Sequence, residues 1–193
     1  MILHDTSLAD ARLIELQPRG DERGWFARTM SRTEFEQAGL NADFRQQNTS
    51  VSANAGTLRG MHFQLGPHTE AKLVRCIRGA IVDIIVDLRL GSPSYLKHEK
   101  FELTPSNNRI LYVPEGFAHA FQTLTEDTEV TYLVTADYTP EAERGVRYSD
   151  PRLGIDWPLE VTTISPKDAA WPLLGEGDPG FFQYQGAGST ATR

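Results

Sequence analysis

The chain has 193 residues, of which 39% are hydrophobic and 23% are charged, and its formal net charge at pH 7 is −7. This composition predicts a single globular domain with a substantial core, and the acidic balance argues against nucleic acid as a partner. No apolar stretch approaches the roughly 20 residues of a membrane span. The N-terminus has no basic start and no long apolar run, so we expect no secretory signal, and Cys76 is the only cysteine. We therefore expect a cytoplasmic protein.

The N-terminal part of the sequence predicts a strand, a turn and a short helix. Residues 11–16 are half apolar, and residues 18–24 are rich in turn-forming types. Residues 31–39 are typical of a short helix, because Ser31 is a good N-cap, Glu34 completes a capping box and a glycine ends the segment.

The middle of the chain predicts a β-structure. From residue 46 to 134, short strands are separated by Gly, Pro and Asn, and the clearest strands are 72–77, 81–87, 110–114 and 128–134. Regularly spaced short strands without intervening helices favour a sandwich or barrel.

The C-terminal part predicts a loop, a helix start and a tail. Residues 138–158 have the composition of a loop, and Ser165 with Pro166 is typical of the start of a short helix. From residue 175 onward the chain is rich in Gly, Ser, Ala and Thr. We expect one domain over residues 1–174, including an N-terminal strand arm, and a flexible tail over 175–193.

Two motifs match the cupin barrel, a double-stranded β-helix or jelly roll. Residues 114–119 have the P-x-G-x-x-H form of the second cupin motif, which directs His119 into the barrel. In the first motif Gly56 precedes His62, but Gln64 stands in place of the second histidine and the usual glutamate is missing at its spacing. A catalytic metal site generally needs three protein ligands. We therefore expect a mainly β cupin, with short peripheral helices, that binds no metal.

Several polar side chains fall within apolar strand sequence. Arg59, His62 and Gln64 lie in one run, and Lys72 opens the next strand. Such groups are costly to bury unless they are paired or used, so we expect a polar cavity for a small anionic molecule. Strand alternation places the side chains of Arg59 and His62 on opposite faces of the strand. A bulge at Gly60 would turn both side chains toward one cavity.

Four side chains suit proton transfer. His62 is a candidate general base, Lys72 can stabilise a developing oxyanion, and Tyr132 can deliver a proton. Asp168 can orient His62 as the acidic member of a dyad. Each also has a structural explanation: a satisfied core histidine, an exposed strand-end lysine, a tyrosine at the rim of the core and a charge at a helix start.

The chain resembles the nucleotide-sugar epimerases typified by dTDP-4-dehydrorhamnose 3,5-epimerase over residues 21–173. The resemblance rests on residues 21–24, Gln46, Asn48, 58–64, 72–75, 86–89, 92–93, 114–119, Tyr138, Pro140, 150–151, 157–158, Ser165 and 167–168. It implies a cupin without metal or cofactor, usually a homodimer in which an N-terminal strand crosses to the partner.

The resemblance also implies a reaction, the inversion of one or both carbons flanking the C4 ketone of an NDP-4-keto-6-deoxyhexose through an enolate. His62 would remove the proton and Asp168 would orient His62. Lys72 would stabilise the enolate oxygen, and Tyr132 would return a proton to the opposite face. The implied substrate contacts are Arg23 and Arg59 at the diphosphate, Phe26 and Tyr138 at the base, and Gln46, Asn48, His119, Glu143 and Lys167.

Three residues depart from the family pattern. Arg28 replaces a usual glutamate near the nucleotide, Gln47 replaces a frequent aspartate, and Ala120 replaces the glycine after the cupin histidine, where we expect it to crowd the pocket. The nucleotide, the sugar and the number of inverted carbons therefore stay open. The alternatives are a mono-epimerase, a ketoisomerase on another nucleotide sugar, a metal-dependent cupin enzyme using His62 and His119, and a non-catalytic sugar-binding module.

Overall fold

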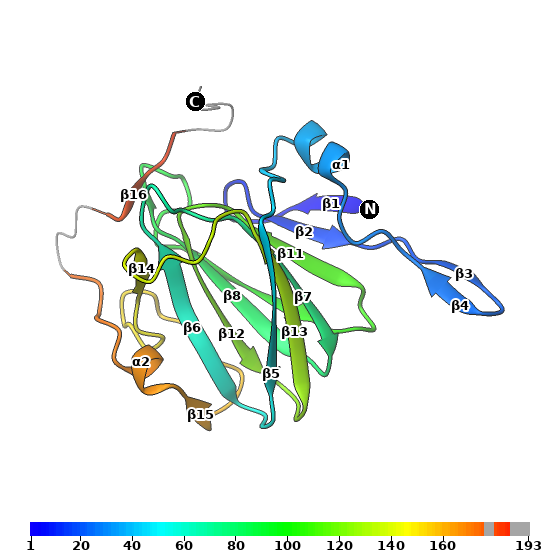
Figure 1. Cartoon of the computed structure of the whole chain (residues 1–193). Coiled ribbons are helices and arrows are strands. Elements are labelled where there is room, and N and C mark those ends of the chain that lie inside the picture. The colour runs from blue at the N-terminus through cyan, green and yellow to red at the C-terminus, as the bar shows by residue number, and fades with distance from the viewer. Residues whose placement is uncertain (176–179, 186–193) are drawn as a thin grey trace.

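The structure, a computed structural model, describes residues 1–175 and 180–185. Figure 1 shows strands arranged in two layers, with the two helices at the periphery. The first sheet has the strand order β1-β2-β11-β7-β13-β5, and the second has the order β10-β8-β12-β6-β14, with β15 beside β6. This mainly β arrangement confirms the predicted cupin fold.

The bounds of the elements agree closely with the predicted segments in the middle of the chain. The first sheet consists of β1 (Ile2–Asp5), β2 (Arg12–Glu15), β11 (Arg109–Val113), β7 (Lys72–Arg78), β13 (Thr128–Val134) and β5 (Gln46–Ser52). The second consists of β10 (His98–Leu103), β8 (Ile81–Asp87), β12 (Phe117–Thr123), β6 (Thr57–Gln64) and β14 (Glu143–Gly145), with β15 (Thr163–Ile164) parallel to β6.

Both predicted helices are present and begin at the predicted caps. Helix α1 (Arg32–Gln37) starts after Ser31, whose Oγ accepts a hydrogen bond from the Glu34 N–H at 3.5 Å. Helix α2 (Pro166–Ala169) starts after Ser165, whose Oγ accepts from the Asp168 N–H at 3.0 Å. The second cap matters for the site, because it fixes the position of Asp168.

The core lies between the two sheets. Side chains from both layers form one buried cluster that includes Val74, Ile85, Leu111 and Val130. Cys76 belongs to the same cluster, and burial raises the pKa of its thiol to about 11. A cavity lined in part by polar side chains also lies between the two sheets, and it is the site described below.

A bulge in β6 brings two predicted site residues to the same side. His62 pairs with His119 and Arg59 pairs with Phe121, so β6 has one residue more than β12 between these two pairs. Gly60, with φ +127°, lies within the bulge. The predicted bulge is thus confirmed, and Arg59 and His62 line one cavity.

Ala120 packs behind this bulge. A Cβ added at Gly60 would lie 2.4 Å from the Ala120 Cβ, so the two residues are in close contact. Ala120 is fully buried in an apolar cluster with Met61 and Val86 and is not among the residues that line the cavity. The expectation that Ala120 crowds the pocket was wrong, because its methyl group points away from it.

The N-terminal region contains a projecting hairpin where the sequence predicted only a turn. Strands β3 (Arg19–Asp21) and β4 (Gly24–Phe26) pair with each other and with no other strand of residues 1–175 and 180–185. Figure 1 shows them extending away from the barrel. Strand β1 pairs with β2 at the edge of its own chain's sheet. None of the helices in the described part of the chain is long and apolar enough to cross a membrane.

Part of the predicted C-terminal tail is described. Strand β16 (Phe182–Gln183) pairs in parallel with β9 (Arg89–Leu90). The rings of Phe181 and Phe182 pack on Phe63, with centroids 4.8 and 5.6 Å away. The other parts of the predicted tail, 176–179 and 186–193, lie outside the described residues.

Candidate active site

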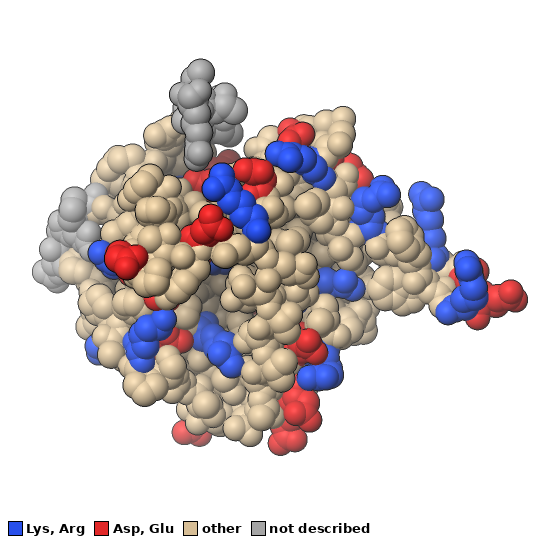
Figure 2. Space-filling model, in the orientation of Figure 1, with Lys and Arg blue, Asp and Glu red and all other residues tan. Residues whose placement is uncertain are grey.

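A cavity of about 540 Å³ opens between the two sheets beside α2. Figure 2 shows the hollow on this face of the molecule, with basic side chains at its edge. It is lined by Ser50, Thr57, Leu58, Arg59, His62, Lys72, His119, Phe121, Tyr132, Thr163, Ile164, Ser165, Lys167 and Asp168. A second cavity of about 300 Å³ shares His62, Lys72 and Tyr132 with the first. Three of the four predicted proton-transfer groups therefore lie where the two cavities meet, and the fourth, Asp168, lines the first cavity.

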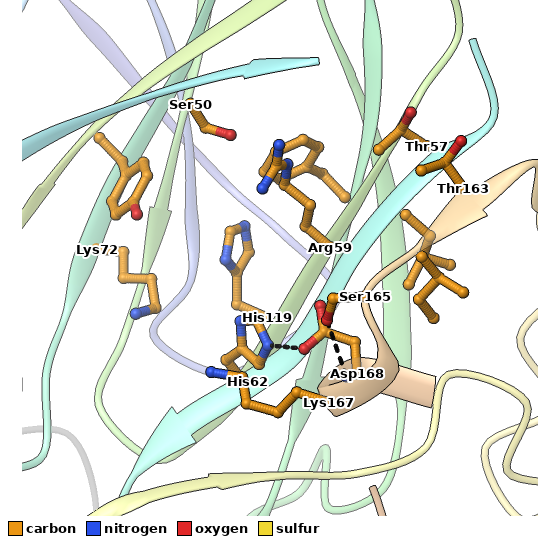
Figure 3. A pocket seen from close by; sticks show the side chains of 14 residues that line it. Ser50, Thr57, Arg59, His62, Lys72, His119, Thr163, Ser165, Lys167 and Asp168 are labelled. Atoms are coloured by element: carbon orange, nitrogen blue, oxygen red, sulfur yellow. Dashed lines mark hydrogen bonds and ion pairs between the residues drawn. The ribbon is translucent and has the colours of Figure 1, made fainter. Parts of the chain in front are cut away.

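His62 and Asp168 form the dyad that the sequence predicted. The His62 Nε2 lies 2.7 Å from the Asp168 Oδ1 (Figure 3). The Gly60 N–H donates to the Asp168 Oδ2 at 3.1 Å. Burial opposes ionisation of Asp168, but the hydrogen bond and charge of His62 together lower the pKa of its carboxyl. Because the carboxylate holds Nε2, the other ring nitrogen, Nδ1, is the one left for a substrate.

Lys72 reaches the cavity from β7 and is paired. Its ammonium forms an ion pair with the Glu70 carboxylate, and both side chains are about nine-tenths buried. Glu70 is a site residue that sequence reasoning missed, because it lies too far along the chain to be the glutamate of the first cupin motif. A carboxylate two residues before a lysine in an apolar strand was the signal that could have revealed it.

Tyr132 lines both cavities from β13. Burial raises the pKa of its phenol, the nearby negative charge of Glu70 adds to this effect, and Arg59 opposes it. The hydroxyl is therefore protonated near neutral pH and is able to donate a proton. His62 and Tyr132 come from different sheets, so they approach the space between them from opposite sides.

A second histidine–carboxylate pair forms part of the cavity wall. The His119 Nε2 lies 2.9 and 3.0 Å from the two carboxylate oxygens of Asp83, which is fully buried in β8. His119 was predicted as a substrate contact, but Asp83 was missed. The sequence signal that could have revealed it is the position of Asp83 itself, a carboxylate within the β-branched run of residues 81–87. A buried carboxylate of this kind needs a partner, and the register of β8 and β12 supplies it.

Arg59 is anchored at the other end of the cavity. Its Nε donates to the Ser52 Oγ at 3.2 Å, and its Nη2 donates to the Val51 carbonyl at 3.1 Å. A guanidinium has five N–H donors, so this anchoring leaves donors for a phosphate oxygen.

Five further predicted contact residues gather at the rim. The Lys167 Nζ lies 2.8 Å from the Glu143 carboxylate, which also accepts from the Tyr138 hydroxyl at 2.9 Å. The Tyr138 N–H donates to the Gln46 Oε1 at 3.0 Å, and Asn48 lies beside Gln46 on β5 in the wall of the second cavity. The hydrogen bond to Glu143 is the main cause that raises the pKa of Lys167.

Comparison with known proteins assigns this site to a family. The family model described as dTDP-4-dehydrorhamnose 3,5-epimerase matches residues 5–176. The chain is 44% identical over 185 residues to the dTDP-4-dehydrorhamnose 3,5-epimerase of Sinorhizobium fredii, which covers 95% of this chain and 94% of the relative. The chain belongs to the dTDP-4-dehydrorhamnose 3,5-epimerase family.

Two solved structures of similar proteins carry relevant ligands. The dTDP-6-deoxy-D-glucose-3,5-epimerase of Legionella pneumophila, in complex with dTDP-4-keto-L-rhamnose, has a TM-score of 0.88 and 37% identity and covers 96% of this chain and 99% of its own. A 3'-monoepimerase from Streptomyces bikiniensis, in complex with dTDP-quinovose, has a TM-score of 0.82 and 34% identity. It covers 88% of this chain and 86% of its own. The fold is thus shared with epimerases of two kinds.

Two predicted contacts of this family member lie away from its cavity. Arg23 is exposed at the hairpin, where its guanidinium pairs with Asp21 at 2.5 Å, and Phe26 is 68% exposed on β4. Neither residue lines the cavity that holds His62. Figure 2 shows charged side chains of both signs at the tip of the hairpin, far from the hollow. Within one chain, therefore, these two residues are not brought to the site.

Two of the departures from the family pattern also lie outside the cavities around His62. Arg28 lines a small cavity with Met1 and Glu34 near the hairpin. The Gln47 amide donates to the Thr131 Oγ1 at 3.2 Å and contributes to a different hollow.

No group of three or more His, Cys, Asp or Glu side chains in the described residues is arranged to hold a metal ion. The two cupin histidines are each paired with a carboxylate instead: His62 with Asp168, and His119 with Asp83.

Proposed function

We propose that this chain is a cofactor-independent epimerase that inverts one or both carbons flanking the C4 ketone of a dTDP-4-keto-6-deoxyhexose. One observation carries the proposal: the His62–Asp168 dyad, the Lys72 ammonium and the Tyr132 phenol meet at one cavity in a member of this family. The relatives named above are epimerases of dTDP sugars, which supports this substrate class.

The first step is removal of a proton from a carbon beside the ketone. The His62 Nδ1 accepts the proton, and the electron pair of the broken C–H bond moves toward the carbonyl, which becomes an enolate oxygen. Asp168 stabilises the imidazolium that forms, because its carboxylate accepts the Nε2 hydrogen bond. The Lys72 ammonium stabilises the negative charge on the oxygen.

The second step returns a proton from the other side. The phenol of Tyr132 donates to the carbon while His62 keeps the proton it removed, so the configuration is inverted. The location of β6 and β13 in opposite sheets supports this direction. The imidazolium and the phenolate then exchange with solvent, which restores both groups for another turnover.

The other polar groups of the site bind the nucleotide sugar. Arg59 contacts the diphosphate, Tyr138 contacts the base, and the remaining contacts are made by Gln46, Asn48, His119, Glu143 and Lys167. The sugar lies at the junction of the two cavities and the diphosphate extends toward Arg59.

Arg23 and Phe26 fit this scheme only in an assembly, so we infer a homodimer with N-terminal exchange. Strand β1 pairs with β2 in the first sheet of the same chain. The hairpin of β3 and β4, by contrast, projects and exposes Trp25 and Phe26. Exposed aromatic side chains of this kind are typical of contact surfaces. The hairpin would deliver Arg23 to the diphosphate and Phe26 to the base in the partner's cavity. A cytoplasmic location is part of this proposal and is consistent with the single buried thiol.

Solvent exchange tests the function. In D₂O, the wild-type protein should incorporate deuterium at one or both carbons flanking the ketone of dTDP-4-keto-6-deoxyglucose, and NMR of the product counts the inverted centres. His62→Ala should abolish exchange, whereas His4→Ala, at an exposed histidine paired with Glu15, should leave it unchanged. Absence of exchange with every 4-keto nucleotide sugar would refute the proposal.

The same samples separate the alternatives. A ketoisomerase would move the carbonyl, which product NMR detects. A metal-dependent enzyme would lose activity to a chelator, and a sugar-binding module would bind without exchange. Thermal shifts with dTDP, UDP, GDP and CDP identify the nucleotide, because a ligand of the folded state raises the apparent stability.

A further inference from the structure

Gln64, which stands where a cupin metal ligand is usual, is held by four hydrogen bonds. Its Oε1 accepts from the Thr139 N–H at 2.7 Å, and its Nε2 lies 3.1 Å from the His68 carbonyl and 3.3 Å from the Asp137 carbonyl. The fourth contact, also at 3.3 Å, is with a carboxylate oxygen of Glu70. Gln64 is 4% exposed, so two loop backbones fix its amide in place.

Glu70 connects this fixed amide to the ammonium of Lys72. One of its carboxylate oxygens is bound by Gln64, and the other is paired with the Lys72 Nζ. A buried charge without a partner is strongly unfavourable, so Glu70 and Lys72 each depend on the other. An ammonium has three donors, and this pairing uses one of them, which leaves two to face the cavity.

We infer that Gln64 and Glu70 form a relay that positions Lys72 for catalysis. A lysine side chain has a flexible four-carbon stem, and an oxyanion is stabilised best by a donor whose position is fixed before the reaction. The relay runs from the backbone of residues 137–139 through Gln64 and Glu70 to the ammonium. It rests on the proposed function, because the role of Lys72 at the enolate oxygen belongs to that proposal. Glu70 acts through Lys72 and is a positioning residue.

A double-mutant cycle tests the relay. Lys72→Ala should lower kcat by about 10²–10³-fold, the usual cost of one oxyanion donor. Glu70→Gln should lower kcat by about 10- to 100-fold, because a misplacement of about 1 Å has a cost of that order, and should change KM less than about twofold. In the Lys72→Ala background, Glu70→Gln should have no further effect. Glu115→Gln, at an exposed carboxylate that pairs with Asn41 and Thr69, is the matched control.

A second readout does not depend on turnover. Cyanate carbamylates lysine side chains, and in the wild type the Lys72 Nζ is engaged by the Glu70 carboxylate, which Gln64 holds in turn. Peptide mass spectrometry should therefore show faster carbamylation of Lys72 in Glu70→Gln and in Gln64→Leu than in the wild type. Unchanged carbamylation of Lys72 in the two variants would overturn the relay. So would a double variant whose loss of kcat equals the combined losses of Glu70→Gln and Lys72→Ala. A wild-type protein without exchange would refute the proposed function, while labelling would still decide whether the relay exists.

Discussion

His62 and Asp168 are separated by 106 positions in the sequence, yet the Nε2 of one lies 2.7 Å from the Oδ1 of the other. The contact exists because α2 packs against β6, where the Gly60 N–H also holds the carboxylate. Since Nε2 is bound, Nδ1 is the ring nitrogen available as a base. Orientation of the base thus depends on a residue more than 100 positions away.

Removal of the Asp168 charge should impair proton abstraction. Asp168→Asn keeps an acceptor for the Gly60 N–H but no longer stabilises the imidazolium. We expect kcat to fall by about 10²–10⁴-fold, the range for loss of general base function and its orienting group, with little change in KM. Deuterium incorporation by NMR measures the effect. Asp156→Asn, at a side chain that is 99% exposed, is the control, and a wild-type rate in Asp168→Asn would rule out the dyad as the base.

The same carboxylate should make stability depend on pH. Its folded-state pKa lies below the ordinary value of 3.8, so ionised Asp168 stabilises the fold at pH values above that of the unfolded group, and this contribution is lost as the pH falls through the folded pKa. The difference in unfolding free energy between wild type and Asp168→Asn that is measured at about pH 5 should shrink below about pH 4. Urea denaturation followed by tryptophan fluorescence checks this, and a difference unchanged at pH 3 would contradict it.

Deletion of one hydroxyl should separate the two proton transfers. Tyr132→Phe retains His62, so exchange of the substrate proton with solvent should continue, while formation of the inverted product should fall by about 10²–10⁴-fold. NMR of substrate and product in D₂O distinguishes exchange from inversion. Tyr112→Phe is the matched control, because Tyr112 is also buried but donates to the Asn41 carbonyl outside the site. Equal loss of exchange and inversion would assign Tyr132 another role.

Mixed dimers should show whether the hairpin acts in the partner's site. If Arg23 is supplied by the second chain, heterodimers of His62→Ala and Arg23→Ala contain one intact site, and random assembly restores about a quarter of all sites. The two chains are tagged differently and co-expressed to give the heterodimers. Their activity is then assayed at low substrate concentration. Heterodimers of His62→Ala and Lys72→Ala should recover nothing, because both residues line the same cavity of one chain. Recovery in neither mixture would place Arg23 outside the partner's site.

The features that the sequence determined are those with local signals. The caps of α1 and α2 lie within three residues of the groups they bind, and the β-branched run at 81–87 forms β8 over the same bounds. Gly60 marked the bulge that turns Arg59 and His62 to one side, because glycine tolerates the positive φ that the bulge needs. The cupin motifs and the resemblance supplied the fold and the candidate proton-transfer residues.

The tertiary structure alone decided how those residues are paired and which way others point. Asp83 meets His119 through the register of two strands, Glu70 meets both Lys72 and Gln64, and Ala120 points away from the cavity. The hairpin of β3 and β4 projects because, in the described part of the chain, the two strands pair with each other and not with either sheet. Composition and spacing show that a charge occurs in apolar sequence, but its partner is set by sheet register and by contacts between distant segments.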